Sequence, residues 1–100
     1  MMNNAEFEFV AKALVVDRYN LVNSYDKIGI DDISTIWLAH ILKNNRAVLV
    51  LNSDSDQNIY EVTYCGDKDE LHMNIYAKTV NVRSDGSIVE TLKEKYVYEY

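Results

Sequence analysis

Residues 33–51 read ISTIWLAHILKNNRAVLVL, and this stretch decides the fold. On their own, residues 33–43 are compatible with a helix capped by one of the two preceding aspartates, or with a strand. The residues that follow favour the strand. Residues 43–46 (KNNR) are typical of a two-residue hairpin, because asparagine tolerates the positive φ that both centres of a type I′ turn require. Residues 47–51 then continue as a buried apolar strand.

The N-terminal segment predicts one helix over about residues 4–23. Asn3 or Asn4 supplies the cap, because a short polar side chain accepts hydrogen bonds from the free N–H groups of the first turn. Apolar residues recur every three to four positions and form one stripe, which comprises Phe7, Val10, Leu14 and Leu21, widened by Ala11, Ala13 and Val22. We expect this stripe to pack on the sheet.

The second half of the chain predicts further strands separated by polar turns. Residues 59–65 (IYEVTYC) alternate and are rich in strand formers, and residues 70–83 alternate in the same way. Residues 88–100 fit a helix by the spacing of their apolar residues, or a strand by their tyrosines. We therefore expect a single α+β domain over residues 1–100, with one helix packed on an antiparallel meander of four to five strands. The sheet face away from the helix is then wet or meets a partner.

Composition excludes several classes of protein. The chain has 100 residues, a mass of 11.6 kDa and a net charge of −6, and its hydrophobic content of 48% is too high for a disordered acidic tail. No apolar run approaches the ~18 residues of a membrane span, and no basic residues precede an apolar run at the start, so we expect neither a membrane segment nor a secretory signal. A single cysteine fits a reducing cytoplasm.

Motifs for catalysis, cofactors and metals are missing from the sequence. It contains no G-x-S-x-G, no phosphate-binding glycine loop and no close pair of histidines or cysteines, so we expect no enzyme and no cofactor. A zinc site would need His40, His72 and Cys65 to converge from distant segments, and we expect none. Residues 54–58 match the start of a calcium-binding loop, but Ile59 and Cys65 stand where that loop needs glycine and glutamate.

Acidic charge is concentrated in one segment. Residues 54–70 hold six acidic residues against one lysine, a net −5, whereas the rest nearly cancels. We expect an acidic edge that binds a basic partner, made by Asp54, Asp56, Glu61, Asp67, Asp69 and Glu70, with Tyr60 and Tyr64 as anchors. Direct nucleic-acid binding is not expected, because phosphate contacts need clustered lysines and arginines.

Residues 36–49 (IWLAHILKNNRAVL) and 60–71 (YEVTYCGDKDEL) resemble a group of small uncharacterised proteins that phages and prophages of low-GC Gram-positive bacteria encode. Residues 11–16 (AKALVV) resemble the start of the same group. The resemblance covers about residues 5–78, and the tail from Asp85 departs from it. The group has no assigned activity, so it implies no functional residue.

The phage setting implies a function all the same. Small acidic phage proteins without motifs often resemble inhibitors of host machinery, including anti-CRISPR proteins that occupy the DNA-binding surfaces of Cas9. The resemblance thus implies an inhibitor in the host cytoplasm, which binds a type II CRISPR effector of the Cas9 type through an acidic, nucleic-acid-mimicking surface. The alternative is a phage structural or assembly protein that self-associates, as a homodimer for instance, through the uncovered sheet face or the tyrosine-rich tail.

Overall fold

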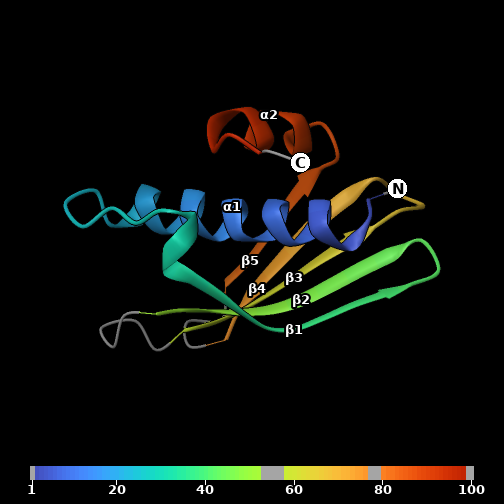
Figure 1. Ribbon diagram of the computed structural model, residues 1–100, viewed down its shortest axis with the longest axis horizontal. Coiled ribbons are helices and arrows are strands. Elements are labelled where there is room, and N and C mark those ends of the chain that lie inside the picture. The colour runs from blue at the N-terminus through green and yellow to red at the C-terminus, as the bar shows by residue number, and fades with distance from the viewer. Residues whose placement is uncertain (1, 53–57, 77–79, 99–100) are drawn as a thin grey trace.

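The computed structural model describes residues 2–52, 58–76 and 80–98 and consists of one sheet with both of its α-helices on the same side (Figure 1). The elements in chain order are α1 (Asn4–Val22), the 3₁₀ helix η1 (Ile30–Asp32), β1 (Ile33–Ile41), β2 (Asn44–Leu51), β3 (Ile59–Cys65), β4 (Glu70–Ile75), β5 (Val80–Asp85) and α2 (Ile88–Lys95). The expected α+β fold, a helix followed by an antiparallel meander, is confirmed. Among the described residues no helix has both the length and the apolar character needed to cross a membrane.

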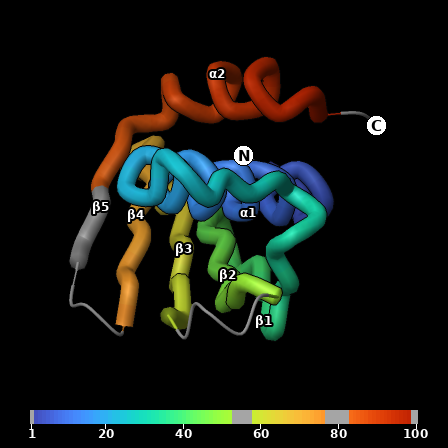
Figure 2. The backbone as a smooth tube through the Cα atoms, turned by 90° about the vertical axis from the view of Figure 1, so that its left-hand side faces the viewer, coloured from blue at the N-terminus to red at the C-terminus, as the bar shows by residue number. Residues whose placement is uncertain are grey.

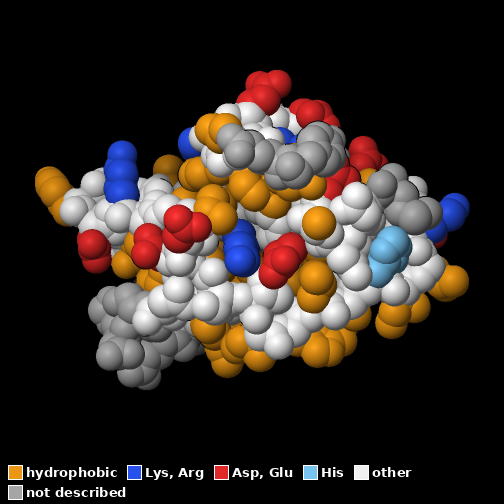
Figure 3. All heavy atoms as spheres, viewed as in Figure 1, with side chains coloured by type: hydrophobic (Ala, Val, Ile, Leu, Met, Phe, Trp, Pro, Cys, Tyr) orange, Lys and Arg blue, Asp and Glu red, His pale blue; other side chains and the backbone are white. Residues whose placement is uncertain are grey.

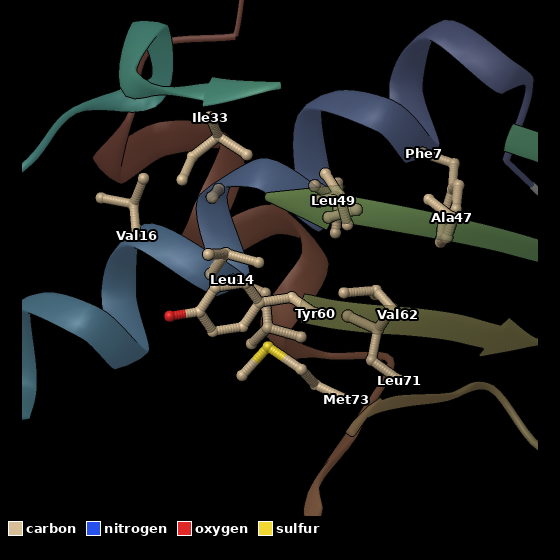
Figure 4. Close-up of a cluster of buried hydrophobic side chains, with 14 of the residues drawn as sticks. Phe7, Leu14, Val16, Ile33, Ala47, Leu49, Tyr60, Val62, Leu71 and Met73 are labelled. Carbon is tan, nitrogen blue, oxygen red and sulfur yellow. The ribbon is translucent and has the colours of Figure 1, made fainter. Parts of the chain in front are cut away.

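The five strands lie in the sheet in sequence order, each antiparallel to the next. Residues 33–41 are therefore a strand, as the hairpin argument favoured, and they form one edge of the sheet. Alternate side chains of β2, β3 and β4 are buried against α1, which lies across the sheet with α2 above it (Figure 2). Figure 4 shows this core, in which Phe7 and Leu14 of α1 meet Leu49, Tyr60, Val62, Leu71 and Met73 of the strands.

Helix α1 begins where the sequence predicts, because Asn3 Oδ1 accepts a hydrogen bond from the backbone N–H of Glu6 at 2.8 Å. The expected stripe is wrong at its C-terminal end, where Leu21 and Val22 are exposed. Val15 and Val16 are buried in their place. The sheet contacts one side of α1 and α2 contacts another, so burial is decided by two neighbours and not by one stripe (Figure 2).

The hairpin between β1 and β2 turns two residues earlier than the sequence predicts. Ile41 pairs with Asn44, so Leu42 and Lys43 form the turn, and Leu42 takes a φ of +57°. Asn45 is not in a turn but fully buried in β2, where its side-chain amide donates to the carbonyl of Met2 at 3.3 Å. This contact with the N-terminal segment draws Asn45 into the core and moves the turn.

The open question of residues 88–100 is settled in favour of a helix over residues 88–95. Leu92 of α2 is buried, and two ion pairs join α2 to α1. The Nζ of Lys93 lies 2.6 Å from a carboxylate oxygen of Glu6, and Lys95 pairs with Asp17. These contacts with α1 stabilise α2 as a helix, because most helical stability in proteins comes from tertiary packing. The tyrosine-rich sequence of the segment does not by itself indicate them.

Candidate functional site

The two tyrosines expected to anchor a partner are part of the core. Tyr60 is 2% exposed and Tyr64 is 6% exposed, and both rings face α1. The Tyr64 hydroxyl donates to Asp69 at 2.6 Å, and this hydrogen bond, together with burial, raises the pKa of Tyr64 to about 12. Their burial removes both rings from the candidate surface. The alternation of residues 59–65 already contained this information, because it places Tyr60 and Tyr64 on the face opposite Glu61.

Glu61 is the one predicted acidic residue in the middle of the sheet, and it already has partners within the chain. Its carboxylate lies 3.4 Å from Nε of Arg46 and accepts a 2.9 Å hydrogen bond from the hydroxyl of Tyr76. Asn74 donates to the same carboxylate at 3.4 Å. The hydrogen bond to Glu61 raises the pKa of Tyr76. Glu61 thus organises the polar half of the sheet surface.

The remaining predicted carboxylates are spread along the end of the sheet. Asp67 lies 3.3 Å from Nζ of Lys43, Asp69 accepts from Tyr64, and Glu70 lies 3.9 Å from Nε2 of His72. Asp54 and Asp56 lie outside the described residues. Within the described part of the chain, the predicted acidic residues therefore contact other residues of the chain and do not form one continuous unpaired acidic surface.

The sheet face away from α1, called the open face here, has no described element packed on it (Figures 1 and 2). Cross-strand pairing defines its rows: Trp37, Val48, Glu61 and Asn74 form one, and Ala39, Arg46, Thr63 and His72 form the next. The half of the open face made by β1 and β2 is mostly apolar, whereas the half made by β3 and β4 is mostly polar. The open face is therefore apolar toward the β1 edge and polar toward β4.

A group of exposed apolar side chains lies at the β1 edge of this face and in the turn that follows β1. The β1 patch comprises Ile36, 61% exposed, Trp37, 48%, Ile41, 67%, and Leu42, 87%. Figure 3 shows hydrophobic side chains along the lower margin of the molecule, over β1 and β2. A half-exposed tryptophan flanked by aliphatic residues is typical of the residues that dominate binding energy in protein interfaces. The β1 patch and the open face are our candidate site.

Leu42 stands out within the β1 patch, because its backbone is in the left-handed region that disfavours side chains with a Cβ. A leucine gains nothing from the core at this position, since most of its surface is in solvent. Packing in the core therefore does not account for the strained backbone at this leucine. A sequence signal for the patch does exist. Residues 33–42 are apolar on both faces of the strand, so one apolar face is exposed when that strand lies at the edge of the sheet.

Other kinds of site receive less support from the described residues. In the described part of the chain, no three histidine, cysteine, aspartate or glutamate side chains lie close enough to hold a metal ion. His40 contacts the carbonyl of Leu42 through Nε2 at 2.9 Å, and His72 lies beside Glu70. A hollow of about 510 Å³ between α1 and the C-terminal residues is lined by Phe9, Ile30 and Tyr98 with the Glu8–Lys12 ion pair.

Comparison with protein families matches residues 8–86 to a family of unknown function, DUF6275. The chain belongs to this family. The matched residues include most of α1 and all five strands, and therefore the whole candidate site, whereas α2 lies beyond them. Comparisons with curated proteins and with solved structures found no match.

Proposed function

We propose that the chain is a phage-encoded inhibitor that binds a host defence protein in the host cytoplasm, with a Cas9-type effector as the first partner to test. It acts by occupying its partner and catalyses no reaction. The observation that carries the proposal is the open face with the β1 patch, where a tryptophan and three aliphatic side chains are held in solvent. Burial of such a patch is worth roughly 25 cal/mol per Å² before the costs of association.

Net charge favours a basic partner. The chain carries −6, so a partner with a positive surface attracts it over distances of about a Debye length before contact. Cas9 holds nucleic acid in positively charged channels and reads its recognition motif through arginines. In this proposal charge accelerates the encounter, and the apolar β1 patch, not mimicry by aligned carboxylates, supplies most of the affinity.

The phage origin rests on the resemblance of residues 36–49 and 60–71. The first of these segments includes Trp37, Ile41 and Leu42 of the β1 patch. The residues that support the origin and those that support binding are thus in part the same, which ties the two parts of the proposal together.

The test is a DNA-cleavage assay with a purified Cas9-type effector, its guide RNA and the full chain in excess. We expect the wild type to suppress cleavage and Trp37→Ala to suppress it at least about ten-fold less well, as loss of an interface anchor does. Leu21→Ala is the matched control, because Leu21 is equally apolar and 76% exposed but lies at the far end of α1. Undiminished cleavage with the wild type would contradict the proposal for that effector.

Charge is tested separately at Asp67, whose side chain is 71% exposed and forms an ion pair with Lys43. We expect Asp67→Lys to slow association at low salt with little effect at high salt, because it changes steering and leaves the β1 patch intact. A loss of affinity equal to that of Trp37→Ala would instead favour the acidic surface as the binding site.

Self-association is the second candidate function. The free edge of β1 favours it, since an edge strand without charged side chains readily pairs with another strand. It is compatible with inhibition, because pairing at an edge leaves the open face uncovered.

A further inference from the structure

Within the part of the chain that the structure describes, the free edge of β1 has little of the usual protection of an edge strand. Natural sheets protect their edges with charged side chains, prolines, short strands or bulges. β1 runs over nine residues, Ile33–Ile41, and contains neither a charged residue nor a proline. Its one irregularity lies between Thr35 and Trp37, so the segment from Trp37 to Ile41 pairs regularly with β2.

The opposite edge of the sheet differs. β5, Val80–Asp85, is shorter, includes Arg83 and Asp85, and leads directly into α2. Exposed apolar side chains are found beside the β1 edge, at Ile36, Trp37 and Ile41. Both the backbone and the side chains at β1 are therefore suited to a further strand.

We propose that a second copy of the chain occupies this edge, with its own β1 paired antiparallel to the first about Ala39. The two five-stranded sheets then form one sheet of ten strands, with both α1 helices on the same side. The inference rests on the second candidate function, self-association, and deepens it by naming the strand and the register. It does not depend on which partner the open face binds.

The β1–β2 turn sets the register of this pairing. Ile41 and Asn44 flank a two-residue turn and face each other, so the backbone groups of Ile41 point toward β2. In an antiparallel strand, the backbone N–H and C=O groups of every second residue point to the same neighbour. The backbone groups of Ala39 and Trp37 therefore also point toward β2. The backbone groups of Leu38 and His40 are left pointing to the free edge. A symmetric pairing that uses them places Ala39 opposite Ala39 of the second copy.

The side chains suit this register. Directly opposed residues that share no hydrogen bond approach most closely, about 4.5 Å between Cα atoms, and alanine is small enough for such a site. On the open face, Trp37 comes opposite Ile41 of the second copy, an aromatic–aliphatic pair that stabilises antiparallel strands. The open face becomes continuous across the junction.

Charge opposes a second copy least at this edge. Each chain carries −6, but β1 contributes none of that charge, so two copies meet where repulsion is least. Added salt screens the remaining repulsion. We therefore expect salt to strengthen the pairing of two copies, whereas it weakens the encounter with a basic partner.

The test is disulfide cross-linking of the purified chain in a Cys65→Ser background, which removes the only native cysteine. Ala39→Cys places two thiols opposite each other, whereas Ile41→Cys places them four residues out of register, about 13 Å apart. We expect mild oxidation to convert Ala39→Cys to a covalent dimer about ten-fold faster than Ile41→Cys, although Ile41 is the more exposed position. Equal rates, or faster cross-linking of Ile41→Cys, would overturn the register.

Sedimentation equilibrium of the wild type provides the measurement that does not depend on a variant. We expect the mass to rise from 11.6 kDa toward twice that value as protein concentration and salt increase. A mass that stays at 11.6 kDa up to about 1 mM, which corresponds to no more than about 4 kcal/mol of binding, would overturn the proposal. Neither result depends on a host protein, so failure here is distinct from failure of the cleavage assay.

Discussion

The carboxylate of Asp69 occupies the space that a side chain on Gly86 would need. Asp69 belongs to the β3–β4 turn, where its φ is +50°, and Gly86 belongs to the turn between β5 and α2. The hydroxyl of Tyr64 donates to the same carboxylate at 2.6 Å. Asp69, expected to bind a partner, thus joins two neighbouring turns at one end of the sheet.

Gly86→Ala is expected to destabilise the fold by about 1–2 kcal/mol, because the added methyl group displaces Asp69 from Tyr64 and a hydrogen bond to a charged group is lost. Urea denaturation measures the change. In an Asp69→Ala background the same substitution is expected to cost much less, since the clash is gone. Additive effects of the two substitutions on the free energy of unfolding would show that Gly86 stabilises the fold for a reason other than leaving room for Asp69.

Tyr64→Phe is expected to lower the free energy of unfolding by about 1.5 kcal/mol at neutral pH. The folded-state pKa of Tyr64 is raised from 10.0 to about 12, so its contribution is fully present below pH 10 and is lost as the pH rises toward 12. The difference between wild type and variant should therefore shrink over that range in denaturation curves measured at successive pH values. Tyr25→Phe, at a fully exposed position, is the control and should change nothing.

Much of the fold follows from local pattern. The helix over residues 4–22 and the strand over residues 59–65 agree with their capping and alternation. The turn at Leu42 does not, because the contact of Asn45 with Met2 joins residues far apart in sequence. The choice of helix for residues 88–95 likewise depends on Glu6 and Asp17 of α1, which a local pattern does not contain.

The candidate site was harder to predict than the fold. The charge count indicates residues 54–70 as a binding surface, but Glu61 pairs with Arg46 of the neighbouring strand and Asp67 of the β3–β4 turn pairs with Lys43 of the β1–β2 turn. Such pairs depend on the register of the strands, which becomes known only when the position of the β1–β2 turn is known. Trp37 was visible in the sequence as an apolar strand residue, and its exposure follows from the place of β1 at the edge of the sheet.

Leu42→Gly is expected to stabilise the fold by about 1 kcal/mol, because glycine relieves the positive φ of the β1–β2 turn. Thermal unfolding measures the gain. Lys43→Gly, the neighbouring turn position, is the control and should be neutral or destabilising, because Lys43 does not have a positive φ. Destabilisation by Leu42→Gly would indicate that the leucine side chain supports the fold, which contradicts its assignment to recognition.

The two ion pairs between α1 and α2 are expected to differ in strength. Lys93→Met should cost about 1–3 kcal/mol, because the side chains of Lys93 and Glu6 are only 13% and 20% exposed and Glu6 is left unpaired. Lys95→Met should cost less than about 1 kcal/mol, since Lys95 and Asp17 are well exposed to solvent. Chemical denaturation of both variants checks the order, and a larger loss for Lys95→Met would contradict it.

The single tryptophan of the chain lies in the candidate site, so it reports directly on whether the open face binds. The chain can be produced with 5-fluorotryptophan, and its one ¹⁹F resonance followed by NMR as an unlabelled, purified Cas9-type effector is added. Leu21→Ala in the same labelled chain serves as the control for α1 and should behave as the wild type. We expect the Trp37 resonance to shift and broaden in proportion to the complex formed. A resonance that stays unchanged at saturating effector would contradict the claim that this face is the binding surface.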